Sequence, residues 1–203
     1  MSHLVFRISS VFGLLLALAV PVANAQEPTV RVRGTIDRVE GDTYVIKTRA
    51  GEVKVKLPDN VMVVALIKAS LADIKQGSYV GVAGMPQPDG SQRALEVHIF
   101  PEPMRGTGDG HRGWDLQPTS TMTNGNVEQT AASNDGHVLT LKYKDGEKKI
   151  VVPKDAPIVV YVLGEKGELK AGANIFIAAA TKQADGTLTT PRINVGRGVA
   201  PPM

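Results

Sequence analysis

The sequence predicts an all-β protein of two small barrels in tandem, joined by a glycine-rich linker. Three observations predict it: apolar residues alternate with polar ones, turn residues recur at short intervals, and the whole pattern is repeated along the chain. The chain has no cysteine. Since disulfides cannot stabilise it, closure of the sheets must bury the apolar faces and protect the strand edges.

The N-terminus is predicted to be a secretory signal peptide, residues 1–25. Arg7 supplies a positive charge, residues 11–22 are almost entirely apolar, and an A-x-A cleavage signal ends at Ala25. The apolar run is too short for a stable membrane anchor. We therefore expect cleavage before Gln26, a periplasmic location, and no membrane span in the mature chain.

The first barrel is expected within residues 26–100. Gly34 lies inside its first strand and predicts a bulge or bend, as a strand needs where it curls round a small barrel. The alternating pattern predicts strands at 30–37, 44–48, 52–57, 61–67, 78–83 and 93–100, with one helical turn at 71–75.

The second barrel, residues 122–196, is predicted from an internal repeat. At an offset of 95 residues, turn residues and core residues coincide, and one inserted residue then aligns the final strands. Coinciding pairs include Gly51 with Gly146, Pro58 with Pro153, Val55 with Ile150, Gly77 with Gly172, Asp89 with Asp185 and Val97 with Ile193. The order of three strands, a short helical turn and two strands is typical of a five-stranded Greek-key barrel of the oligonucleotide/oligosaccharide-binding (OB) type.

Between the repeats lies the linker, residues 101–121, followed at the far end by a short tail, 197–203, that is expected to be flexible. The linker has no counterpart in the other repeat, and it holds the only tryptophan, Trp114. Arginine and tryptophan are enriched at binding hot spots. We therefore place a ligand- or partner-binding site on the linker, at Arg105, His111, Arg112, Trp114 and Asp115.

Structural roles for the same residues remain open at this point. Trp114 could equally be a plug that seals the interface between the barrels. Asp115 could form an ion pair with Arg105 or Arg112 and only fix the loop. The three glycines at 106, 108 and 110 could form an anion-binding nest, but no lysine and no helix follow them as in a phosphate-binding loop.

Metal, cofactor and catalytic sites have little support. Asp109 and His111 are weak candidate metal ligands, since their spacing matches no established pattern. His98 has the opposite strand parity to Val97 and is expected to face out of the barrel core. No cofactor is expected, and the absence of a cysteine or a G-x-S-x-G elbow argues against an enzyme.

Charge argues against nucleic acid as a partner. The net charge is +3, and residues 26–203 carry 22 basic and 20 acidic side chains. Single-strand binders need a basic groove lined with aromatic stacking platforms, whereas this chain has few aromatic residues. The expected partner is a protein or small molecule in the periplasm; the oligomeric state is left open.

The segments GEVKVKLP, ADIKQGSYVGV and PDGSQRALEVHIF, and the linker MRGTGDGHRGWDLQPTSTMTN, together resemble a bacterial exported domain family of unknown function with an OB-like barrel, of an alphaproteobacterial periplasmic type. Some sequences of this type are labelled metal-transport permeases, a label that a chain without spans after its signal peptide contradicts. The resemblance implies no catalytic residues. We expect a non-enzymatic periplasmic binding or scaffolding protein; the alternative is a metal- or small-ligand-handling accessory protein of a transport system.

Overall fold

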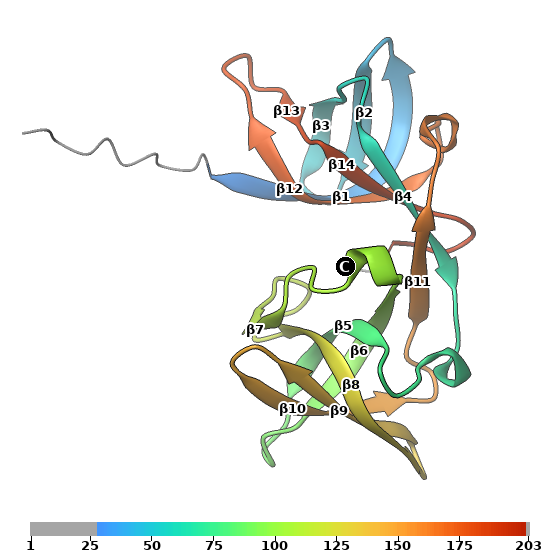
Figure 1. Ribbon diagram of the computed structural model, residues 1–203. Helices are drawn as coiled ribbons and strands as arrows, with labels where there is room; N and C mark the ends of the chain where they lie inside the picture. The colour runs from blue at the N-terminus through green and yellow to red at the C-terminus, as the bar shows by residue number, and fades with distance from the viewer. Residues whose placement is uncertain (1–27, 202–203) are drawn as a thin grey trace, which may run out of the picture.

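The computed structural model describes residues 28–201, so the predicted signal peptide and its cleavage site lie outside the described residues. The described chain is all-β, with three single-turn 3₁₀ helices (Figure 1). Its elements are β1 (Thr29–Glu40), β2 (Thr43–Thr48), β3 (Gly51–Lys56), β4 (Met62–Lys68), η1 (Leu71–Asp73), β5 (Tyr79–Pro86), β6 (Gln92–Phe100), η2 (Glu102–Met104), β7 (Gly110–Gly113), β8 (Thr121–Ser133), β9 (Gly136–Tyr143), β10 (Gly146–Pro153), β11 (Ile158–Leu163), η3 (Lys166–Glu168), β12 (Asn174–Lys182), β13 (Leu188–Thr189) and β14 (Arg192–Gly196).

Five strands form a closed barrel. β5 pairs with β8, β8 with β9, β9 with β10, β10 with β6, and β6 returns to β5. The prediction of an all-β chain with a small five-stranded barrel is confirmed. Inside are the side chains of one apolar core: Ile74, Val80, Val82, Ala94, Val97, Val127, Leu139, Leu141, Ile150, Val152 and Ile158.

A second strand group lies above the closed barrel in Figure 1. In it β1 pairs with β2, β2 with β3, β3 with β13, β13 with β12, and β12 with β1, while β14 joins β12 to β4. Its separate core contains Val32, Ile36, Tyr44, Ile46, Val55, Leu57, Val63, Ala65, Leu169, Ile175, Ile177, Ala180, Leu188, Ile193 and Val195.

The pairing corrects the expectation that residues 26–100 and 122–196 each close a barrel of their own. β5 and β6, from the first segment, pair with β8 and β10 from the second. β12 and β14, from the second segment, pair with β1 and β4 from the first. The crossing is made by β4 and β11, which run side by side between the two groups and pair antiparallel (Figure 1).

Glycines allow the long first strand of each segment to bend against its neighbour. An added Cβ at Gly34 would lie 2.1 Å from the carbonyl oxygen of Lys47, and one at Gly125 would lie 2.6 Å from that of Lys142. The strand register shifts just after each glycine, between Ile36 and Arg38 in β1 and between Val127 and Gln129 in β8. The bulge or bend predicted at Gly34 is therefore present, and β8 has a similar irregularity after Gly125.

The predicted flexible tail starts with an anchored residue. Arg197 donates through its side chain to Glu168 at 2.7 Å, and its backbone amide donates to the carbonyl of Leu66 at 2.9 Å. Val199 packs against buried residues of β4 and β11. The described part of the tail therefore lies along the crossing strands.

Gly34→Ala and Gly125→Ala should each destabilise the protein by about 1–3 kcal/mol, because backbone atoms rather than flexible side-chain ends occupy the space of the new methyl group. Gly167→Ala is the matched control: nothing lies within 4 Å of its added Cβ, so its change should stay within about 0.5 kcal/mol. Urea unfolding of the three variants measures this, and equal stabilities would contradict the close approach.

Separate fragments covering residues 26–117 and 118–203 should each fail to unfold cooperatively, because both cores take side chains from both fragments. Mixing the two should restore a single cooperative transition, seen by circular dichroism during heating. If each fragment folds alone, the contiguous boundaries predicted from the repeat are right and the crossing is wrong.

Candidate functional site

An ion pair ties the linker to the second strand group. Asp115 accepts two hydrogen bonds from the guanidinium of Arg33 on β1, at 2.7 and 3.2 Å, and lies 3.4 Å from Arg31. The alternative partners considered from the sequence, Arg105 and Arg112, are not the ones used. The partners come from a strand about 82 residues earlier in the chain, which local spacing could not reveal.

Two arginines lie close to the ring of Trp114. The guanidinium carbon of Arg31 lies 4.0 Å from its ring centroid and that of Arg112 lies 5.6 Å away, so cation–π attraction fixes the ring. The backbone amide of Trp114 donates to the carbonyl of Ser120 at 2.8 Å. Its indole Nε1 is buried and has no hydrogen-bond partner.

The ring of Trp114 borders a cavity of about 240 Å³, which we call the central cavity. It lies where the closed barrel, the second strand group and the linker meet. Its exposed lining residues, which include Arg112, Ala178 and Ala179, form the rim where it opens to solvent. Its walls are His98 and Phe100 of β6, Thr107, Gly108, Arg112 and Trp114 of the linker, Met122 and Asn124 of β8, Tyr161 of β11, Phe176, Ala178 and Ala179 of β12, Thr190 and Pro191, and Arg192 and Asn194 of β14.

Aromatic residues are concentrated in this one place. Residues 26–203 contain seven Phe, Trp and Tyr side chains, and four of them line the cavity: Phe100, Trp114, Tyr161 and Phe176. The ring centroids of Phe100 and Tyr161 lie 4.9 Å apart. A chain poor in aromatic residues thus gathers more than half of these aromatic side chains around one cavity, and aromatic side chains are common in the walls of small-molecule sites.

Polar atoms on the cavity residues lack partners. Besides Nε1 of Trp114, the buried atoms without a hydrogen bond are Nε of Arg192 and the side-chain oxygens of Asn124 and Asn194. Asn124 donates its Nδ2 to the carbonyl of Thr107 at 2.9 Å, which fixes its Oδ1 as the unpaired acceptor. Buried polar atoms are almost always paired, so these four atoms stand out on the residues that line the cavity.

Two arginines of the cavity have no acidic partner among the described residues. Arg112 donates to the carbonyl of Gly108 at 2.7 Å, and Arg192 lies over the ring of Tyr161, with its guanidinium carbon 5.7 Å from the centroid. Neither forms a salt bridge within 28–201. Desolvation lowers the pKa of both side chains, and for Arg112 the nearby charge of Arg31 lowers the pKa further.

A hydrogen-bonded chain forms one side of the cavity. His98 Nε2 is 2.9 Å from Oε1 of Glu96, and its Nδ1 is 3.3 Å from the hydroxyl of Tyr161. His98 has the outward parity expected from the sequence and lies outside the barrel core, yet it is buried, with the ring of Tyr161 packed edge-on against its imidazole. Burial raises the pKa of Tyr161, so the phenol stays protonated.

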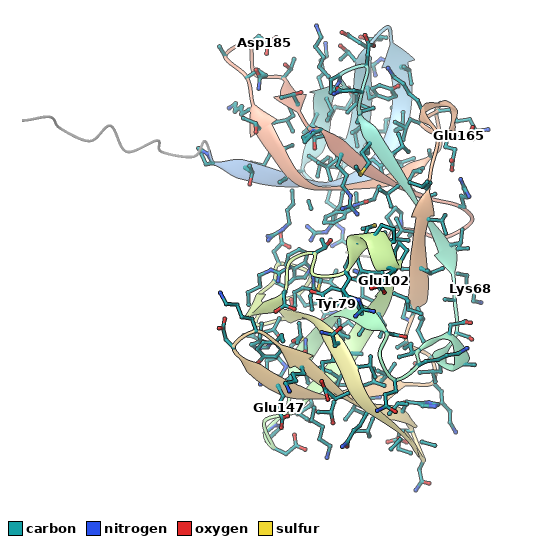
Figure 2. The ribbon with its side chains drawn as sticks, in the orientation of Figure 1. Lys68, Tyr79, Glu102, Glu147, Glu165 and Asp185 are labelled. Carbon is teal, nitrogen blue, oxygen red and sulfur yellow. The ribbon has the colours of Figure 1, made fainter. Side chains whose placement is uncertain are left out.

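Arg105 lies away from the central cavity. It forms an ion pair with Glu102 at 2.6 Å and donates to the carbonyl of Gly77 at 3.0 Å and to Asn126. Figure 2 labels Glu102 on the linker and Tyr79 on β5, close together where the linker meets the closed barrel. Arg105 therefore holds the start of the linker against Gly77, which precedes β5, and against β8.

Asp109 and His111 are used for local structure and do not lie together as a metal site. Asp109 accepts hydrogen bonds from the backbone amide of Lys144 at 2.7 Å and from the hydroxyl of Tyr79 at 3.3 Å. His111 Nδ1 is 2.7 Å from Oγ1 of Thr123, and desolvation lowers the pKa of the ring. Within residues 28–201, no three His, Cys, Asp or Glu side chains could hold a metal ion together.

Comparisons with known proteins add no identity: no family model, no curated protein and no solved structure matches this chain. No helix within the described residues is long and apolar enough to cross a membrane.

Of the predicted site residues, the structure brings Arg112 and Trp114 to one cavity and places Asp115 behind them. Sequence reasoning missed Arg192, Asn124 and Phe176, which lie on strands outside the linker. A weak signal was available in Arg192, an arginine one residue before a core position, Ile193, and directly after a proline.

Asp115→Asn should release the linker from β1, with a loss below about 1 kcal/mol because the pair is partly exposed. Arg33, first by its hydrogen bonds and then by its charge, lowers the pKa of Asp115 below the ordinary 3.8. Its stabilisation is therefore present above that value and is lost as pH falls below it. The stability gap between wild type and variant, from urea unfolding, should be largest above about pH 5 and should shrink towards pH 2. A gap independent of pH would contradict the ion pair.

Proposed function

We propose that this chain is an exported, non-enzymatic binding protein that holds a small ligand in the central cavity. The observation that carries the proposal is the combination of an aromatic wall with unpaired buried donors and acceptors around one opening. Leaving such groups unpaired costs about 1–3 kcal/mol each. A ligand that satisfies them would recover that free energy.

A proposed duplication supports a specialised site. Under the offset of the repeat, Leu66 corresponds to Tyr161, and these two residues pair with each other across β4 and β11. The parallel pairing of Ile150 with Gln92 likewise corresponds to that of Val55 with Leu188. We infer two intertwined copies related by an approximate two-fold axis between β4 and β11.

The copies differ at the cavity. Core positions keep their character, as in Val97 and Ile193. Phe176, Arg192 and Asn194 line the cavity. In the alignment of the repeat they correspond to Gly81, Glu96 and His98. Differences of size and charge that gather beside the axis support a role there that one copy could not provide.

The linker gives the site its third wall. Trp114 and Arg112 reach the cavity from the linker, while Asp115 holds the linker to β1. This arrangement favours binding in the cavity over the scaffolding role that was the other possibility for the linker. It also favours binding over metal handling, since Asp109 and His111 are engaged elsewhere.

We propose no catalysis by the chain of Glu96, His98 and Tyr161. It has the order of an acid–histidine–hydroxyl relay, but a nucleophilic hydroxyl must lose its proton readily. The raised pKa of Tyr161 opposes that loss. We assign the chain to holding the ring of Tyr161 and the imidazole in place on the cavity wall.

Single-ring probes such as phenylacetamide and phenylacetate should change the fluorescence of Trp114, which is the only tryptophan and lines the cavity. A probe at a hundred times its Kd should add about 2.7 kcal/mol of stability and raise Tm by about 5–10 °C. Ala178→Leu narrows the rim and should weaken binding; Ala132→Leu, on an exposed part of β8, is its control. If no probe alters fluorescence or Tm, the proposed function is wrong.

A further inference from the structure

We infer that the ligand of the central cavity is a small organic anion, with a carboxylate or similar acidic head and an apolar or aromatic body. The inference rests on the proposed binding function and adds to it the charge and size of the ligand. Four features of the described residues carry it: unpaired arginines, unpaired N–H donors, excess positive charge and the aromatic wall.

The arginines are the first feature. Arg112 and Arg192 both line the cavity and neither has a carboxylate within salt-bridge distance in the described part of the chain. Arg192 is partly buried, and a guanidinium removed from water without a counter-ion is costly. Arg112 is exposed at the rim of the cavity, where an anion can reach it. An acidic head group would supply the missing partner, and the planar guanidinium suits a carboxylate in particular.

The unpaired donors are the second feature. Trp114 Nε1 and Arg192 Nε are buried without acceptors, and both groups can only donate. Their assignment as donors is therefore certain, unlike that of an asparagine amide or a histidine ring, whose atoms can be donors or acceptors depending on orientation. The oxygens of Asn124 and Asn194 need donors, which a hydroxyl on the ligand or a water molecule beside its head would provide.

Excess positive charge around the cavity is the third feature. Asp115 faces Arg31 and Arg33, and Glu96 faces His98. Among the described residues that line the cavity, Arg112 and Arg192 carry full positive charges and none is an aspartate or glutamate. This excess would favour an anion over a neutral ligand of the same shape and would oppose a cation.

The volume of the cavity and the residues of its wall determine what the apolar part of the ligand can be. A cavity of about 150 Å³ lined by apolar side chains holds benzene, and the central cavity measures about 240 Å³. One ring or a short branched chain, together with the head group, therefore fills it. Phe100, Phe176 and Tyr161 offer ring faces and edges for that body.

The test compares phenylacetate with phenylacetamide, which has the same shape and no charge, on the full mature chain, with Trp114 fluorescence as the readout. Phenylacetate should bind about tenfold tighter or more, as expected where hydrogen bonds to a charged head replace neutral ones. Added salt should reduce this preference. Arg192→Gln and Arg112→Gln should each lower it severalfold, while Arg93→Gln, an exposed arginine on β6, should leave it unchanged.

The outcomes separate the two proposals. Equal affinity for the two probes overturns the anionic ligand and leaves the binding function standing. Binding of neither probe overturns the proposed function, and the anionic ligand with it. If Arg192→Gln fails to fold by circular dichroism, Arg112→Gln decides, because Arg112 is on the linker; an unchanged preference in a folded Arg112→Gln contradicts the inference.

Discussion

The antiparallel pairing of β4 with β11 is the interaction on which the rest of the structure depends. Each of these strands begins in one strand group and ends beside the other, and their pairing holds the two segments together. Because β5 and β6 follow β4, and β12 to β14 follow β11, each core is completed by strands from the opposite segment. Neither core can form fully without the crossing, so the two are expected to fold cooperatively.

The crossing also determines where a site can form. The linker begins after β6 and ends before β8, and both strands belong to the closed barrel. It is nevertheless drawn to the second strand group by Asp115 and its arginines on β1. A loop held to both groups encloses the space between them, and the aromatic side chains that would otherwise be exposed there line that space.

Much of the fold follows from local pattern, and the pairing does not. Alternating apolar residues, turns and the bend at Gly34 are fixed by neighbours a few residues away, so the strands and the all-β class could be predicted. The alternation in the sequence would be the same whether β5 and β6 paired with strands of their own segment or with strands of the other segment. The site divides in the same way: Trp114 and Arg112 stand out on the linker, whereas Arg192 and Asn124 become site residues only through the crossing. Arg105 and His111 have the right chemistry for a site but are engaged by near neighbours on the closed barrel.

The position of the cavity explains why its residues are so poorly paired. Across the proposed two-fold axis, two identical copies would bring like residues together, and like charges would repel. The two segments carry different residues at corresponding positions, as with Glu96 and Arg192, and Arg192 has no acidic partner among the described residues. A structural interface alone would favour apolar or fully paired residues, since unpaired buried groups lower stability. Arg192, Trp114 and Asn124 retain unpaired atoms beside the central cavity, and the proposed ligand would supply partners for them.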